Sequence, residues 1–187
     1  MSSPPTLRRA DRQMSDDTAR KALAEGYCGR LATIGADGYP YCVPLLYVVL
    51  KDEIWLHNAR AHGHLRANVQ HETKACFEID EAGAVFPYGR FECDSSIGYR
   101  SVIVFGRIRI VEDVPAKQHF FEALMAKYAK PEWARPAGFF PRLGEITVYA
   151  MTIKRLTGKE NPQPAAAEQW PAVDRTKSPN ARPPGAS

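Results

Sequence analysis

The side chains best suited to chemistry fall in one stretch of the chain, residues 53–70. An apolar segment there runs directly into His57, a polar loop with Gly63 follows, and a helical pattern begins near His64 and Arg66. The first N–H groups of a helix have no backbone partner and carry partial positive charge, so an anion is stabilised at such a corner. The stretch is therefore either the phosphate site of a cofactor or a basic surface loop.

Histidine and arginine supply the candidate chemistry. His57 could exchange a proton near neutral pH, although a strand-end histidine satisfied by its neighbours fits the same position. His62, His64 and His71 are expected to face solvent, and no His-x-x-x-His pair with a carboxylate or neighbouring cysteine suggests a metal. Arg66 and Arg100 suit bidentate contact with a phosphate, or simple surface ion pairs. Haem, with His57 or His64 as axial ligand, is a further alternative.

Composition excludes several classes of protein. The 187 residues carry a net charge of +4, from 25 Lys and Arg against 21 Asp and Glu, and the arginines are scattered. A nucleic-acid partner is therefore not expected. Apolar runs fall short of the roughly 20 residues that span a bilayer, and the first 13 residues resemble no signal peptide, so we expect neither a membrane partner nor export. The four cysteines show no Cys-x-x-Cys spacing and are expected to be buried thiols of a cytoplasmic protein: Cys28, Cys42, Cys76 and Cys93.

Strand patterns dominate the elements that must position these residues. Ser15 predicts the start of a helix, Asp37-Gly38 predicts a hairpin, and Gly106 predicts a bulge. Pro44 indicates an edge strand, a bulge or a place where a ligand replaces the partner strand. The predicted strands are 27–34, 39–50, 53–57, 74–80, 97–111 and 145–156; the predicted helices are 16–25, 63–70 and 115–129; the longer loops are 81–95 and 131–144.

These elements predict a mainly β protein, a small six-stranded barrel with peripheral helices. Three regions are expected: a disordered arm at 1–13, the folded domain at 14–160, and a Pro- and Ala-rich tail at 161–187 that cannot build a core. Side chains fill the interior of so small a barrel. A ligand is therefore expected in a cleft on its outside or between two subunits.

Several motifs together resemble a known family. They are Gly29-Arg30-Leu31-Ala32-Thr33, Asp37-Gly38-x-Pro40-Tyr41-x-Val43-Pro44-Leu45, Leu56-His57-x-Ala59, Gly63-x-x-Arg66 and Cys76-Phe77-Glu78. In order and spacing they resemble the FMN-binding split-barrel proteins related to pyridoxamine 5′-phosphate oxidase. The segments 99–106 and 157–161 are similar to the 5-nitroimidazole-resistance (Nim) branch, and the resemblance spans about residues 12–172.

The resemblance implies a homodimer with FMN in a cleft shared by both subunits. It places the backbone of Val43, Pro44 and Leu45 beside the flavin ring. It assigns the ribityl-phosphate end to His57, Asn58 and Ala59. Arg66 would neutralise the phosphate together with the backbone N–H groups near Gly63 and His64. Arg100, Ser101 and Val102 would line the same cleft from the second subunit.

The resemblance also implies an activity. An FMN-dependent oxidoreductase would take two electrons from a reduced nicotinamide or another donor and pass them to a small electron-poor acceptor, such as a nitroimidazole, with His57 delivering a proton. Oxidation of pyridoxamine 5′-phosphate is not expected, because the segment 157–161 replaces the strand that completes the substrate's phosphate site. The alternatives are a flavin- or haem-binding carrier or sensor without turnover, a deazaflavin cofactor, and an interaction protein without a cofactor.

Overall fold

The computed structural model describes residues 7–88, 93–133 and 136–165. It contains three α-helices, α1 (Asp16–Glu25), α2 (His64–His71) and α3 (Val114–Tyr128), and the 3₁₀ turns η1 (Ala10–Arg12) and η2 (Leu143–Glu145). The strands are β1 (Gly29–Ile34), β2 (Pro40–Leu45), β3 (Tyr47–Leu50), β4 (Glu53–Ala59), β5 (Lys74–Pro87), β6 (Ser95–Val111) and β7 (Ile146–Asn161). The protein is therefore mainly β, as expected. None of the described helices is both long and apolar enough to span a bilayer.

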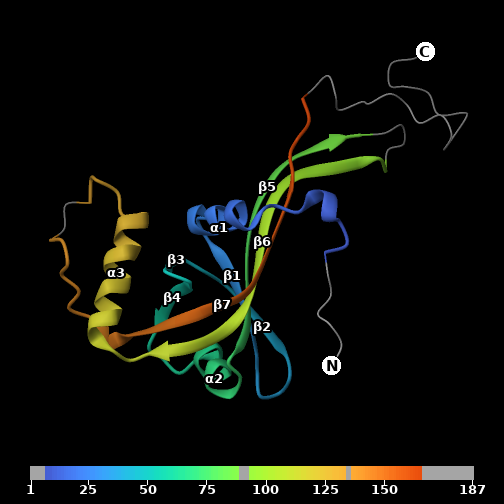
Figure 1. Ribbon diagram of the computed structural model, residues 1–187. Coiled ribbons are helices and arrows are strands. Elements are labelled where there is room, and N and C mark those ends of the chain that lie inside the picture. The colour runs from blue at the N-terminus through green and yellow to red at the C-terminus, as the bar shows by residue number, and fades with distance from the viewer. Residues whose placement is uncertain (1–6, 89–92, 134–135, 166–187) are drawn as a thin grey trace, which may run out of the picture.

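The seven strands form one antiparallel sheet in the order β2-β1-β5-β6-β7-β4-β3 (Figure 1). Its two edge strands, β2 and β3, are joined by Leu46 alone. A flat sheet of this size would hold its edges about 29 Å apart, whereas two successive Cα–Cα steps cover less than about 8 Å. The sheet therefore curls until its edges meet at this corner, and hydrogen bonds between the described strands do not close it.

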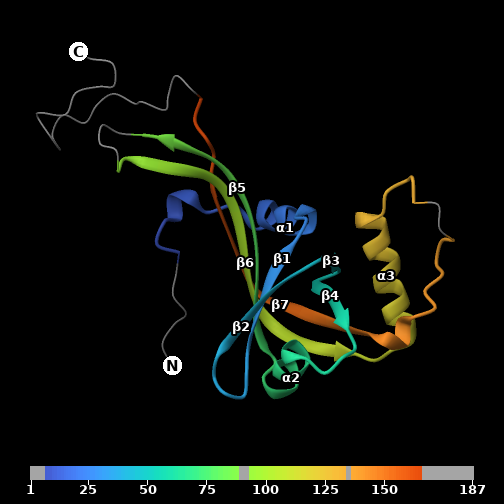
Figure 2. The ribbon, with the colours of Figure 1, turned by 180° about the vertical axis from the view of Figure 1, so that it is seen from behind.

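Each face of the curled sheet carries its own core. On the inner face, α1 and α2 cover a cluster that includes Leu31, Phe77 and Tyr149. On the outer face, α3 covers a smaller cluster around Phe120 and Val148. Figures 1 and 2 show α3 standing apart from α1 and α2 at one end of the sheet. No helix among the described residues covers the outer face of β1, β2 and β5.

The local signals for helices and turns are confirmed. The Ser15 hydroxyl accepts a hydrogen bond from the Thr18 N–H at 3.1 Å and caps α1. Gly38 has a φ of 81° in the hairpin turn, which a glycine adopts without strain. Pro44 lies in an edge strand, because β2 pairs only with β1. The register of β6 and β7 shifts between Phe105 and Gly106, where the bulge was predicted.

Three expectations about the strands were wrong. The segment 39–50 is two strands on opposite edges of the sheet, so the sheet has seven strands instead of six. The segment 81–87, expected to be a loop, continues β5, and a register shift between Ala82 and Val85 absorbs its irregular sequence. The last strand runs to Asn161 because it stays paired with the extended β6. In the expected N-terminal arm, residues 10–12 form a 3₁₀ turn, and Gln13 bridges to Lys159; most of the expected tail lies outside the described residues.

The expectation of buried thiols was also wrong. All four cysteines are free; Cys28 and Cys76 are half-buried, and Cys42 and Cys93 are exposed. Cys42 and Cys76 both pair across the sheet with Ala32, on the outer face that no helix covers. An apolar strand pattern identifies a strand but does not tell which of its faces another layer will cover.

Candidate functional site

The corner between β4 and α2 has an open helix N-terminus. Gly63 occupies the N-cap position, so no side chain there satisfies the first N–H groups of α2. A Cβ placed on Gly63 would meet only the Ala61 carbonyl oxygen, at 4.0 Å. The described residues therefore leave room beside Gly63 at the start of the helix. An uncapped N-terminus with free space before it suits an anionic oxygen.

Arg66 lies within the first turn of the same helix and is held in place. Its Nη1 donates a hydrogen bond to the Thr147 hydroxyl at 3.0 Å, and its Nη2 lies 3.6 Å from the Glu112 carboxylate. Only 21% of the side chain is exposed. The guanidinium is therefore fixed beside the helix N-terminus with donor capacity to spare, since it has five N–H groups.

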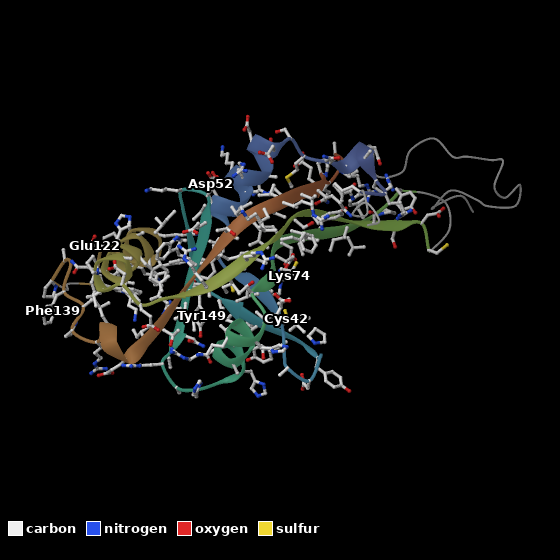
Figure 3. The ribbon with its side chains drawn as sticks, turned by 60° about the horizontal axis from the view of Figure 1, so that its bottom comes forward. Cys42, Asp52, Lys74, Glu122, Phe139 and Tyr149 are labelled. Carbon is white, nitrogen blue, oxygen red and sulfur yellow. The ribbon has the colours of Figure 1, made fainter. Side chains whose placement is uncertain are left out.

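A half-buried polar pair lies near Arg66. The Tyr149 hydroxyl donates a hydrogen bond to the Asn58 side-chain oxygen at 3.1 Å, and burial raises the pKa of Tyr149. Asn58 and Thr147 are directly paired in the β4–β7 ladder, so the two strands present them on the same inner face. Figure 3 shows Tyr149 near α2, in the interior of the molecule.

Two more cations approach the same end of the sheet. Arg60 donates through Nη1 to the Gly144 carbonyl at 2.8 Å. Lys117, on α3, donates to the Ile146 carbonyl at 3.5 Å, and its Nζ lies 3.7 Å from Glu112. Glu112 thus lies between Lys117 and Arg66. Two cations therefore flank one carboxylate and leave an excess of positive charge, which favours an anionic ligand.

The edge strand β2 reaches this corner. The ring of Tyr41 stacks on His64, with centroids 5.2 Å apart and planes inclined by 16°. Val43 and Leu45 pack partly against the inner core, whereas Pro44 is exposed on the outer face. The structure therefore brings together the predicted ring-facing strand and the predicted phosphate corner. No group of three or more His, Cys, Asp and Glu side chains among the described residues could hold a metal ion.

His57 lies on the opposite face of the sheet from Asn58. Its ring contacts Phe120 and Phe121 of α3, with centroids 5.6 and 5.2 Å away. Its Nδ1 is buried and has no hydrogen-bond partner among the described residues, and burial lowers the pKa of His57. His57 therefore does not share a pocket with Arg66 within one chain. Ala59, at the end of β4, is exposed.

The third predicted segment lies far along β6. Arg100 forms an ion pair with Glu81 at 2.7 Å, and the side chain of Val102 is fully buried in the inner core. Ser101 is half-buried on the outer face. Glu112, which contacts Arg66, is twelve residues further along, up to about 40 Å of extended chain. One chain therefore does not bring Arg100 and Arg66 together.

Sequence reasoning missed Thr147, Tyr149 and Lys117. Thr147 and Tyr149 alternate on the predicted last strand, which places them on one face of the sheet. Their pairing with β4, some 90 residues earlier, is a long-range feature without a local signal. Lys117 sits in the amphipathic helix α3 and is almost wholly buried, which its residue type does not suggest.

One family model matches most of the chain. The family model described as pyridoxamine 5′-phosphate oxidase matches residues 15–160. A comparison with curated protein sequences gives no significant match.

Solved structures share the fold at low identity. The flavocytochrome Anf3 from Azotobacter vinelandii superposes with a TM-score of 0.72 at 17% identity, covering 87% of this chain and 77% of that one. The FAD and heme binding protein from Mycobacterium smegmatis superposes with a TM-score of 0.68 at 23% sequence identity, covering 84% of this chain and 78% of that one. A candidate 5-nitroimidazole antibiotic resistance protein from Bacteroides thetaiotaomicron superposes with a TM-score of 0.64 at 18% sequence identity, covering 79% of this chain and 85% of that one. At these identities the likeness shows the fold alone.

Proposed function

The chain belongs to the pyridoxamine 5′-phosphate oxidase family, and from that premise we propose that it is a flavin-dependent oxidoreductase that reduces a small electron-poor acceptor. The observation that carries the proposal is the corner at α2. There an uncapped helix N-terminus, free space at Gly63 and a fixed Arg66 meet. These residues fit a phosphate monoester, which is the terminal group of FMN, and FMN is therefore the proposed cofactor.

Arg66 and the first N–H groups of α2 would bind the phosphate. Arg66 would offer charge-assisted donors that the Thr147 contact already orients, so little side-chain freedom is lost on binding. Asn58 and Tyr149 would support this corner from below through their half-buried hydrogen bond. The isoalloxazine ring would lie along the edge strand β2, at Val43, Pro44 and Leu45, where no other described strand pairs with the free edge.

A second copy of this chain would complete the site. The outer face of the sheet exposes Ile97, Ile103 and Phe105, each at least 38% accessible, and Val85 pairs with Ile97 on the same face. Exposed apolar side chains along one sheet face mark an interaction surface. A partner subunit placed there would supply its own Arg100 and Ser101. The curled sheet with meeting edges is what a split β-barrel requires, and we propose that architecture for the dimer.

A bound flavin supplies the electron-transfer chemistry, and the protein supplies orientation and exclusion of water. His57 is shielded by α3 and, with a lowered pKa, is neutral at pH 7. Its remaining N–H can still donate a hydrogen bond, so its proposed part is to orient the acceptor from an uncharged state. A neutral imidazole is too weak an acid to release that proton, so the proton for the reduced acceptor would come from solvent. By likeness to the nitroimidazole-resistance fold, a nitroaromatic is the proposed acceptor.

Turnover tests the proposal. The purified protein should show flavin absorbance and oxidise a reduced nicotinamide with a nitroimidazole at a rate well above that of the same concentration of free FMN. A rate equal to that of free FMN would reject the oxidoreductase. The second candidate, a flavin- or haem-binding carrier without turnover, is favoured by the likeness to an FAD and heme binding protein. It predicts the same cofactor spectrum without catalysis.

A further inference from the structure

A hollow of about 580 Å³ lies between α3 and the segment that follows it. Its walls include Phe121, Glu122, Met125, Trp133, Phe139 and Phe140. Figure 3 shows Glu122 on α3 and Phe139 on the neighbouring loop at the same end of the molecule. The volume lies within the usual range for a small-molecule site, and the lining is mostly apolar, as in such sites. None of the residues proposed for the flavin belongs to it.

The aromatic walls are partly fixed and partly open to solvent. Phe121 is buried and packs edge-on against His57, and its ring lies 5.6 Å from that of Phe140. Phe139, by contrast, is 67% exposed. A smaller hollow of about 180 Å³ shares these three phenylalanines. A rigid inner wall and an exposed aromatic rim suit a ligand with a flat apolar body.

Among the described residues of this lining, Glu122 is the charged side chain. Its carboxylate accepts a hydrogen bond from the Gln118 side chain at 3.0 Å and forms no ion pair with any described residue. A carboxylate that has no ion-pair partner among the described residues and lies beside several aromatic rings favours a cation, both by its charge and through the electron-rich ring faces. The same carboxylate repels an anion, so the hollow should favour cationic over anionic ligands. The cationic corner at α2 has the opposite preference.

We propose that this hollow binds a compact organic cation with an aromatic body. The aromatic walls would hold the flat body and Glu122 would pair with the ammonium group. This inference is independent of the flavin site. A second copy of this chain seated on Phe139 is the competing occupant, and the experiment below separates the two.

The test is calorimetric titration of the full chain with three probes of one shape: protonated 2-naphthylmethylamine, neutral 2-naphthylmethanol and the anion 2-naphthoate. We expect the cation to bind several-fold to about 30-fold more tightly than the neutral probe, and the anion most weakly. Saturation with FMN should leave the cation's affinity unchanged. Equal affinities for the three probes, no binding of the cation, or competition by FMN would overturn the proposal.

Two variants, each with a matched control variant, localise the effect. Glu122→Gln should abolish the preference for the cation, whereas Glu25→Gln, which removes a glutamate charge on α1, should retain it. Phe139→Ala should weaken all three probes, and Tyr39→Ala, which removes an exposed ring from a distant hairpin, should not. If Phe139→Ala instead dissociates an oligomer seen by light scattering and leaves the affinity for the cation unchanged, the hollow is a subunit contact and the proposal is wrong.

Discussion

Replacing His57 by leucine tests how α3 shields that side chain. In the folded protein the imidazole lies against Phe120 and Phe121, and its buried Nδ1 has no partner among the described residues. Burial lowers the pKa of His57 below its ordinary value of about 6.5. Because the folded state disfavours the protonated ring, protonation favours unfolding.

The sign and size of the effect follow from linkage. Well above pH 6.5 both states are neutral at this residue, and the contribution of His57 to the free energy of unfolding is complete. As the pH falls below 6.5, the unfolded chain binds the proton first, so stability is lost down to the folded pKa. One proton limits the loss to about 1.4 kcal/mol per pH unit. Between pH 7.5 and 5.5 His57 can therefore account for at most about 1.4 kcal/mol.

Urea unfolding followed by circular dichroism at several pH values measures this loss. We expect wild type to lose more stability than His57→Leu between pH 7.5 and 5.5, by an amount up to that limit. His119→Gln, at an exposed position on the same helix, is the matched control and should follow wild type. Equal losses in wild type and His57→Leu would refute the claim that α3 buries a neutral imidazole.

Three further substitutions test the β6–β7 bulge and the attachment of α3, which together support the sheet that carries the site. Gly106→Ala should destabilise the protein by about 1–3 kcal/mol, seen in urea unfolding, because its Cβ would collide with the Thr152 carbonyl at the bulge. Tyr128→Phe should cost a similar amount and loosen α3 in hydrogen exchange, since its hydroxyl lies 2.8 Å from two backbone carbonyls. Asp113→Ala should lower the melting temperature by about 2–4 °C, because its carboxylate caps α3 through the Ala116 N–H.

Local signals predicted the elements well. Ser15 and Gly26 bracket a helix within one residue, and Gly106 marks a bulge, because these features depend on neighbouring backbone alone. The split of 39–50 into two strands could not be predicted in this way. It depends on Leu46 carrying the chain from one edge of a curled sheet to the other, which is a property of the whole sheet.

In the candidate site, too, local features could be predicted from the sequence and long-range contacts could not. Gly63 and Arg66 are close in sequence, and the structure places them together at the start of α2. Thr147, which orients Arg66, comes from a strand 81 residues later, so no local pattern connects them. The strand period of two already separates His57 from Asn58, because adjacent residues of a strand point to opposite faces. Assigning both to one ligand end overlooked that alternation.

The central claim is that the corner at α2 binds the phosphate of a flavin through Arg66. Its most direct test is the dissociation constant of FMN for the wild type and for Arg66→Gln, with Arg20→Gln on α1 as control and melting curves to confirm folding. Loss of a charge-assisted contact to phosphate predicts affinity about 10- to 150-fold weaker for Arg66→Gln and unchanged for Arg20→Gln. Riboflavin, which lacks the phosphate, should bind the wild type and Arg66→Gln with equal affinity. Folded Arg66→Gln that binds FMN as tightly as wild type would contradict the claim.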